Sequence, residues 1–176
     1  MGELPEHVAV NREHWDSIAD DWVEMGERAW SSTRTSWGNW GVTDFDLLPS
    51  DMSGLDAIEL GCGTAYVSAW MARRGARVVA IDNSERQLAT ARRLADEHGL
   101  EIELLHGNAE TVPHPDDSFD FAVSEYGAAL WAEPRVWLTE AARLLRPGGR
   151  LTFLTSHPWL QVCSPLDGSL PVTETL

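Results

Sequence analysis

The fold is decided by residues 58–65, which read IELGCGTA. A short apolar run ends there in a glycine-rich turn, and apolar residues at helical spacing begin directly after it. Gly61 and Gly63 allow the backbone to turn tightly and to approach a ligand closely. Such a turn between a strand and a helix is where parallel sheets bind nucleotides. The stretch therefore predicts an α/β fold with a ligand site at the carboxyl ends of its strands.

Outward from this turn, the chain alternates predicted strands and helices. Apolar runs predict strands at 57–60, 77–81, 101–105, 119–123 and 150–155. Helical spacing predicts helices at 66–74, between Ser84 and Gly99, and from Pro134 to the turn at 147–149. Strands separated by helices favour right-handed βαβ units, so we expect a Rossmann-like, doubly wound and mainly parallel sheet.

The N-terminal segment differs in composition from the rest of the chain. It holds five of the nine tryptophans, and residues 31–41 read as a loop. Apolar residues at helical spacing predict a helix over 8–30 whose inward stripe is Trp15, Ile18, Ala19, Trp22, Met25 and Ala29. Such a stripe needs a surface to cover.

Composition excludes several function classes. The 176 residues suit one domain, and the 28 acidic against 13 basic residues give a net charge of −15. That charge disfavours nucleic acids and anionic membranes as partners, because phosphates would be repelled. All the basic residues are arginine, which excludes a lysine nucleophile, a Schiff base and the lysine of a phosphate-binding loop.

Cysteine usage and the absence of targeting signals indicate the compartment. Cys62 and Cys163 form neither a disulfide framework nor a metal-binding pattern, so a reducing environment is the simpler expectation. The acidic N-terminus does not read as a signal peptide, and no apolar run is long enough to span a membrane. We expect a cytoplasmic protein without a metal site.

The chemistry of the expected site depends on Asp82, which follows Gly63 by 19 residues at the tip of the second predicted strand. A carboxylate there can accept hydrogen bonds from both hydroxyls of a ribose. A dinucleotide site is the alternative, but its third glycine would fall at Tyr66. Glu59 would also be unfavourable beside a pyrophosphate, whereas it is favourable beside a cation. An NAD-dependent oxidoreductase is therefore disfavoured.

Five motifs in order resemble those of the class I S-adenosylmethionine-dependent methyltransferases. They are ELGCGT at 59–64, VAIDNS at 79–84, GNAE at 107–110, FDFAVS at 119–124 and LRPGGRL at 145–151. HWDSIADDW at 14–22 is similar to a helix that caps the cofactor in the methyltransferase-11-like, small-molecule branch of that family. The resemblance implies S-adenosylmethionine as cofactor and a small-molecule methyl acceptor.

The resemblance also implies a set of cofactor-binding residues: Glu59, Gly61, Cys62, Gly63, Asp82, Asn83, Asn108, Ala109, Glu110, Ser124 and Glu125. In this scheme Asp82 binds the ribose hydroxyls and Glu59 lies near the amino group of the methionine moiety. Asn83 lies beside the adenine, and the backbone N–H of Ala109 serves adenine N1. Asn108 replaces the more usual aspartate, and its amide oxygen can still accept from the adenine amine.

Methyl transfer from a sulfonium is an in-line displacement, for which a protein chiefly supplies alignment and desolvation. If a base is needed, the candidates are Glu125, Tyr126 and His157, close to the ends of the fourth and fifth predicted strands. The alternative is a non-catalytic S-adenosylmethionine-binding module, or a fragment without turnover. Both readings predict cofactor binding, and only the enzyme predicts turnover.

The resemblance covers 55–156, and the antiparallel hairpin that completes the family's sheet is missing from the residues that follow. We divide the chain into an N-terminal helical cap and loop (1–54), an S-adenosylmethionine-binding core (55–160) and an irregular tail (161–176). Without the hairpin, the strand at 150–155 has a free apolar edge, which predicts either self-association, with a homodimer as the expected form, or a chain that is a fragment of a longer folded protein.

Overall fold

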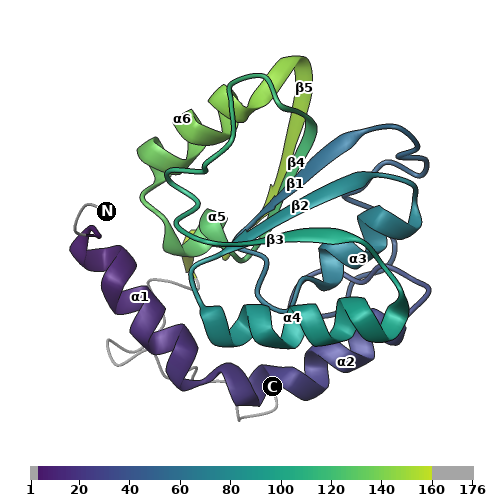
Figure 1. Ribbon diagram of the computed structural model, residues 1–176, viewed down its shortest axis with the longest axis horizontal. Helices are drawn as coiled ribbons and strands as arrows, with labels where there is room; N and C mark the ends of the chain where they lie inside the picture. The colour runs from purple at the N-terminus through teal and green to yellow at the C-terminus, as the bar shows by residue number, and fades with distance from the viewer. Residues whose placement is uncertain (1–3, 160–176) are drawn as a thin grey trace.

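The computed structural model of the chain describes residues 4–159. Its centre is a sheet of five strands: β1 (Asp56–Leu60), β2 (Arg77–Asp82), β3 (Ile102–His106), β4 (Phe119–Glu125) and β5 (Leu145–Leu154). The strand order is β3-β2-β1-β4-β5, and every pairing is parallel (Figure 1). The predicted doubly wound α/β fold is confirmed, with a sheet that is wholly parallel in the described part of the chain.

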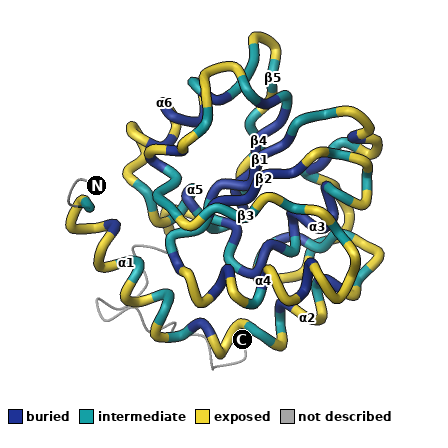
Figure 2. Tube along the Cα trace, viewed as in Figure 1, coloured by how far each residue is buried: buried dark blue, intermediate teal, exposed yellow. Residues whose placement is uncertain are grey.

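Helices cover both faces of the sheet. On one face lie α3 (Tyr66–Arg73) and α4 (Glu85–His98), and on the other lies α6 (Pro134–Leu144), preceded by the short helix α5 (Ala128–Trp131) (Figure 1). Successive side chains of β1 alternate between the two layers. Ile58 packs in the cluster that contains Trp137 of α6, and Ala57 packs in the cluster that contains Met71 of α3. The central strands are accordingly buried (Figure 2).

The residues predicted to begin and end α4, Ser84 and Gly99, are confirmed. The Ser84 hydroxyl accepts a hydrogen bond from the backbone N–H of Gln87, as an N-cap side chain does. Gly99 ends the helix in the left-handed conformation, with φ of 63°, which a glycine adopts without steric cost. The local signals therefore place the amino end of α4 at the tip of β2.

The start of β5 differs from the prediction. We expected a turn at 147–149 and a strand from 150, but β5 already begins at Leu145. Phe119 of β4 pairs with Leu145 and Phe121 pairs with Arg150, so residues 146–149 bulge out of the ladder. The glycines allow this bulge, since Gly148 has φ of 86°.

We predicted one continuous helix over 8–30, and this prediction is wrong. The segment consists of α1 (Glu6–Ser17), the 3-10 turn η1 (Ala19–Trp22) and α2 (Val23–Ser31). The break lies at Ile18, whose φ of −108° is not helical. It shifts the helical phase, so the predicted inward stripe is wrong in part: Trp22 is 37% exposed and Trp30 is buried. Both helices run along the outer side of α4 (Figure 1).

The sheet has two edge strands, β3 and β5, and within residues 4–159 β5 pairs only with β4. The predicted irregular tail, 161–176, and Cys163 within it lie outside the described residues. In the part that the structure describes, no helix has both the length and the apolar character needed to cross a membrane.

Candidate functional site

The glycine turn and the tip of β2 are joined through Asp82. Oδ2 of Asp82 accepts a hydrogen bond of 2.7 Å from the backbone N–H of Gly63, and Oδ1 accepts one of 2.8 Å from the N–H of Ser84. A carboxylate oxygen accepts up to two hydrogen bonds, so each oxygen keeps one lone pair for a ligand. Burial raises the pKa of Asp82 despite these two bonds.

The two glycines of the turn serve different purposes. Gly61 has φ of 77°, and a Cβ there would lie 2.5 Å from the backbone nitrogen of Ala128, so it is needed for packing between the ends of β1 and β4. Gly63 has φ of 52° and faces open space: a Cβ there would meet only Oε1 of Gln87, at 3.9 Å. Gly63, whose N–H is bonded to Asp82, is therefore the residue of the turn that has room beside it.

Glu59 is buried on the α3 side of β1. Its Oε2 accepts hydrogen bonds from both the backbone N–H and the hydroxyl of Ser68. Burial raises the pKa of Glu59 to about 8, and the negative charges of Glu125 and Asp82 add to the effect. The inner wall of the site therefore carries a carboxyl group that a nearby cation would help to ionise.

Asn83 contacts the N-terminal helix. Its Nδ2 donates to the carbonyl oxygen of Val8 at 2.7 Å, and its Oδ1 accepts from Nε of Arg12 at 2.9 Å. The structure thus places Asn83 next to Asp82 but uses both ends of its amide to hold α1.

The loop that follows β3 brings Asn108, Ala109 and Glu110 together. Oδ1 of Asn108 accepts the backbone N–H of Glu110 at 3.0 Å, which leaves one lone pair on that oxygen. Oε1 of Glu110 lies 2.7 Å from Nε2 of His7 and accepts the N–H of Glu133 at 2.8 Å. Burial alone would raise the pKa of Glu110, but these contacts outweigh it and lower the pKa. Glu110 therefore connects α1 to the start of α6.

The side chains of Ser124 and Glu125, at the end of β4, form hydrogen bonds with neighbouring segments. The Ser124 hydroxyl donates to the carbonyl oxygen of Leu60 at 2.7 Å. Glu125 accepts the backbone N–H of Gly38 on Oε1, at 2.8 Å, and the hydroxyl of Tyr66 on Oε2. Burial and the adjacent Glu125 raise the pKa of Tyr66 well above its ordinary value, so the phenol stays protonated.

The three candidate bases lie at or just after the ends of two neighbouring strands, β4 and β5. Tyr126 directly follows Glu125 and has a left-handed backbone, with φ of 53°. His157 follows β5 and is exposed, and its Nδ1 accepts the backbone N–H of Trp159 at 3.2 Å. Glu125 and Tyr126 share the end of β4, whereas His157 has no hydrogen bond to either within the described residues.

Cys62 lies in the middle of the turn and is buried. Burial raises the pKa of its thiol well above the ordinary value, with the charges of Asp82 and Glu59 contributing. The side chain is therefore a protonated, weakly polar part of the core, and within residues 4–159 no group of three metal-ligating side chains is found.

Two polar residues that the sequence reasoning did not single out lie buried at the site. Oγ1 of Thr64 and Oε1 of Gln87 have no hydrogen-bond partner among residues 4–159. The sequence carried a signal for Gln87, because a glutamine directly before the inward-facing Leu88 is unusual on the apolar side of a helix.

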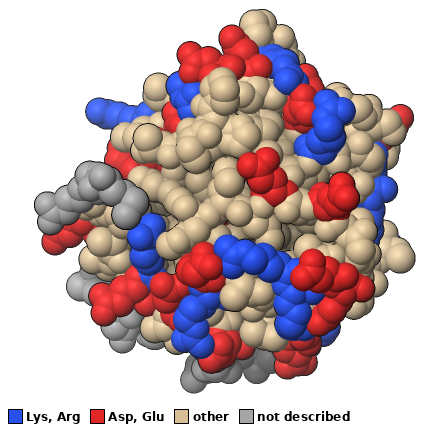
Figure 3. Space-filling view, in the orientation of Figure 1, with Lys and Arg blue, Asp and Glu red and all other residues tan. Residues whose placement is uncertain are grey.

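The N-terminal helices are held over this edge of the molecule by polar and aromatic contacts. Asp16 accepts the Ser84 hydroxyl at 2.6 Å, and Arg86 pairs with Asp20 at 2.8 Å. Trp15 stacks edge-to-face on Trp131 of α5, with ring centroids 5.3 Å apart. Figure 3 shows side chains of both charges interleaved along the rim formed by α4 and the N-terminal helices.

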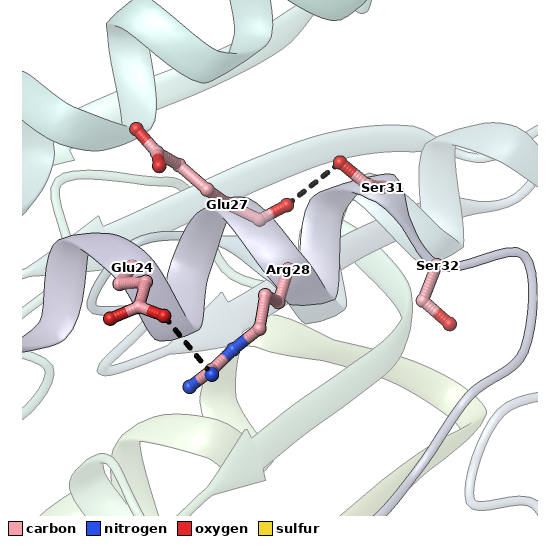
Figure 4. Close-up of a pocket in the computed structure, with 5 residues that line it drawn as sticks. All are labelled: Glu24, Glu27, Arg28, Ser31 and Ser32. Atoms are coloured by element: carbon pink, nitrogen blue, oxygen red, sulfur yellow. Dashed lines mark hydrogen bonds and ion pairs between the residues drawn. The ribbon is translucent and has the colours of Figure 1, made fainter.

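Two surface depressions lie elsewhere. The first, of about 390 Å³, is formed on α2 by Glu24, Glu27, Arg28, Ser31 and Ser32 (Figure 4). Its Glu24–Arg28 ion pair is exposed, and its serine hydroxyl at 31 donates to the Glu27 carbonyl. The second, of about 960 Å³, lies near the amino ends of β2 and β3. Neither contains a residue of the motifs at the carboxyl ends of the strands.

The geometry fits a nucleoside with a cationic group. Asp82, bonded to the N–H groups of Gly63 and Ser84, keeps a lone pair on each carboxylate oxygen, and the glycine turn beside it has open space at Gly63. Glu59 and Glu125 add carboxyl groups deeper in the molecule, and a cation bound near Glu59 would favour its ionised form.

Comparison with known proteins gives a consistent assignment. A family model, Methyltransf_11 (methyltransferase domain), matches residues 58–153, more than half of the chain. The ubiquinone biosynthesis O-methyltransferase of Ruegeria sp. (strain TM1040) is 34% identical over 72% of this chain and 48% of its own length. The demethylmenaquinone methyltransferase of Clavibacter sepedonicus is 41% identical over 57% of this chain and 40% of its own length.

Solved structures agree with the fold. A S-adenosylmethionine-dependent methyltransferase from Mesorhizobium loti is 31% identical, with a TM-score of 0.57 over 65% of this chain and 52% of that one. The [4+2]-cyclase SpnF has a TM-score of 0.65 over 85% of this chain and 60% of that one, but its 23% identity shows likeness of fold alone. The chain spans less than half the length of the two curated relatives described above.

Proposed function

The chain belongs to the methyltransferase domain family, and from this premise we propose that it binds S-adenosylmethionine and transfers its methyl group to a small-molecule acceptor. The observation that carries the proposal is the arrangement of Asp82 and the glycine turn at 61–63, which we call the cradle. Asp82 is bonded to the N–H of Gly63 and keeps a lone pair on each carboxylate oxygen, and the position of a side chain at 63 is open.

The residues of the cradle have distinct roles in this proposal. Asp82 accepts the ribose hydroxyls, and Gly61, Cys62 and Gly63 form the backbone beside the ribose and the methionine moiety. Glu59 faces the amino group, and the backbone at Ser124 and Glu125 completes that end. At the other end, Asn83, Asn108, Ala109 and Glu110 surround the adenine.

The bound cofactor supplies an activated methyl group on a sulfonium. The protein contributes alignment, exclusion of water and electrostatic attraction. A positively charged ligand would favour ionisation of Glu59, whose pKa is raised by burial and by the charges of Glu125 and Asp82. The N-terminal helices, held by Asn83 and Glu110, shield the cofactor from water.

The acceptor is proposed from the relatives and from the end of β4. Relatives named for ubiquinone and menaquinone biosynthesis support a small-molecule acceptor. Glu125 and Tyr126, at the carboxyl end of β4, are the first candidates for a base. Glu125 is an acceptor already, from Tyr66 and Gly38, so it would take a proton only if one of these bonds were released. His157 is the third candidate.

The proposal includes the division of the chain, its location and its assembly. Residues 1–54 form the cap, 55–160 the cofactor-binding core and 161–176 a tail. A cytoplasmic location is supported by the buried, free thiol of Cys62, and a homodimer by the outer position of β5 in the sheet. The net charge of −15 supports partners other than nucleic acids.

Calorimetry with S-adenosylhomocysteine and with NAD tests the binding step. We expect S-adenosylhomocysteine to bind and NAD not to bind, and the opposite result would overturn the proposal. Asp82→Asn should weaken binding about 10- to 100-fold, because it loses charge-assisted hydrogen bonds. Asp96→Asn, the same change on the exposed side of α4, should leave the affinity unchanged.

Turnover is measured separately, as formation of S-adenosylhomocysteine from S-adenosylmethionine in the presence of a panel of phenolic acceptors. Formation that depends on one of these acceptors supports the enzyme. Binding of S-adenosylhomocysteine without acceptor-dependent turnover would instead favour the alternative, a cofactor-binding module without catalysis.

A further inference from the structure

Three residues of the turn that follows β1 have a left-handed backbone: Gly61, Gly63 and Ala65, with φ of 77°, 52° and 60°. Ala65 carries the strain, because a Cβ disfavours this conformation and a glycine has none. Backbone strain of this kind persists only where the surrounding structure holds it. The turn therefore needs contacts that fix it, and Asp82 supplies one of them, at the N–H of Gly63.

A second contact with the turn comes from α2. Trp30, which is 1% exposed, donates its indole N–H to the carbonyl oxygen of Thr64 at 2.7 Å. Thr64 is the residue directly before Ala65. The N–H of Ser68, four residues further on, donates to Glu59 at 2.8 Å, so the indole serves this buried carbonyl in its place. Trp30 therefore holds the backbone of the turn next to its strained residue.

The side chain of Thr64 lies against the same helix. A Cβ on Gly26 would stand 2.7 Å from Oγ1 and 3.0 Å from Cβ of Thr64, so a glycine at this position lets α2 approach the turn closely. Gly26 and Trp30 are four residues apart and so lie on one face of the helix. That face of α2 therefore contacts both the carbonyl group and the side chain of Thr64.

Trp70 of α3 forms a similar bond that does not involve the turn. It is 4% exposed, and its indole N–H donates to the carbonyl oxygen of Ala29 in α2 at 3.2 Å. Trp30 and Trp70 are thus two buried indoles that each join α2 to the rest of the molecule through a backbone carbonyl. Only the bond of Trp30 ends on the glycine turn, and the two form a matched pair for comparison.

We propose that Trp30 is a positioning residue for the cofactor: its bond to Thr64 holds the turn at 61–65 in the conformation that binds the nucleoside, before the cofactor arrives. This inference rests on the proposed function. Holding the turn raises the fraction of the free protein that is ready to bind, and the measured affinity rises in proportion to that fraction. The helix α2 thus acts on cofactor affinity through Thr64.

The test compares Trp30→Phe with Trp70→Phe in the full chain. Each variant keeps a buried aromatic ring and loses one indole N–H that was bonded to a backbone carbonyl. Dissociation constants for S-adenosylhomocysteine are measured by calorimetry. We expect Trp30→Phe to bind about 5- to 10-fold more weakly, the effect of one hydrogen bond, and Trp70→Phe to bind as the unchanged chain does. A merely structural role would lower the Tm of both variants and leave both affinities unchanged.

Gly26→Ala tests the contact of α2 with the side chain of Thr64. Alanine favours a helix more than glycine does, so the helix itself gains from this change. The added methyl group nevertheless meets Thr64, and we expect it to push α2 away from the turn and to weaken binding of S-adenosylhomocysteine as Trp30→Phe does. An unchanged affinity would contradict the inference that α2 sets the turn.

Amide hydrogen exchange without ligand gives a readout that does not depend on binding. Exchange in the turn at 61–65 should be faster in Trp30→Phe than in the unchanged chain, and Trp70→Phe should leave it unchanged. Supporting results are therefore a faster exchange and a weaker affinity that are both specific to Trp30→Phe.

The outcomes separate this inference from the proposed function. Equal losses of affinity in Trp30→Phe and Trp70→Phe would mean that any loosening of α2 has this effect, and an unchanged affinity of Trp30→Phe would mean that its bond does not set the turn. Either result overturns the inference while the proposed function stands. If the unchanged chain binds no S-adenosylhomocysteine, the proposed function fails, and the inference about the cofactor fails with it.

Discussion

The backbone of Gly127 lies directly against the carbonyl group of Gly61: a Cβ on Gly127 would stand 2.0 Å from that oxygen. Real Cβ atoms do not approach an oxygen so closely, so the two glycines allow the ends of β1 and β4 to meet. The hydrogen bond from the Ser124 hydroxyl to the carbonyl of Leu60 fastens the same junction. The shape of the proposed cofactor site therefore depends on a residue outside the glycine turn.

Gly127→Ala should destabilise the protein by about 3 kcal/mol, because the added methyl group overpacks a junction made of backbone atoms. Gly63→Ala is the matched control, since it faces open space and should cost only the strain of a left-handed alanine, about 1–2 kcal/mol. Chemical denaturation measures both. Gly63→Ala should nevertheless lose more affinity for S-adenosylhomocysteine than its stability suggests. Equal destabilisation by the two variants would contradict the packing role of Gly127.

Glu59 should make stability fall as the pH rises. Its pKa is raised from 4.5 to about 8 in the folded protein, chiefly by burial. The unfolded chain therefore releases this proton first, and between roughly pH 4.5 and 8 the folded state binds more protons than the unfolded state. Over that range ionisation favours unfolding, by up to about 1.4 kcal/mol per pH unit.

Glu59→Gln removes this titration and keeps an acceptor for Ser68. We expect the variant to gain stability relative to the unchanged chain as the pH is raised from 5 to 8, by several kcal/mol at most. Urea unfolding at both values measures the difference. A difference that is independent of pH would show that Glu59 is ionised in the folded protein throughout this range.

The rate of proteolysis within α1 should depend on the hydrogen bonds that Asn83 forms with that helix. The chain contains no lysine, so trypsin cleaves only after arginine, and Arg12 lies within α1 beside Asn83. Asn83→Ala removes hydrogen bonds to Val8 and Arg12, and cleavage after Arg12 should become about 5- to 10-fold faster.

Asp96→Ala, on the exposed side of α4, is the control and should leave the cleavage rate unchanged. S-adenosylhomocysteine should slow the cleavage of the unchanged chain, if α1 covers the cofactor. The same rate with and without this ligand would argue against a cap.

The sheet and its helices could be predicted from the sequence because their signals are local. Ser84 and Gly99 end α4 where an N-cap residue and a left-handed glycine are expected, and the apolar runs fix the strands. The glycine turn and Asp82 could be placed for the same reason, since both follow directly from strand ends.

Contacts between distant segments could not be predicted in this way. Gly127 is required by Gly61, 66 residues before it, and Glu110 is positioned by His7 and Glu133. The break at Ile18 also has no proline or glycine to announce it, and it moved Trp30 rather than Trp22 into the core. Such features arise from packing between elements, which a local pattern does not encode.

β5 is one of the two edge strands of the sheet, and its free edge leads to a prediction about assembly. Within the described residues β5 pairs on one side only, and Phe153 on it is 45% exposed. An unpaired apolar strand favours pairing with another chain, while a net charge of −15 opposes unspecific aggregation, so we expect a dimer. Phe153→Lys places a charge beside this edge, on the face where Phe153 contacts Trp137 of α6, and should shift the dimer to monomer in sedimentation equilibrium. Arg135→Lys, an exposed change on α6, should leave the mass unchanged. A monodisperse monomer for the unchanged chain would show that this edge is covered within a single molecule.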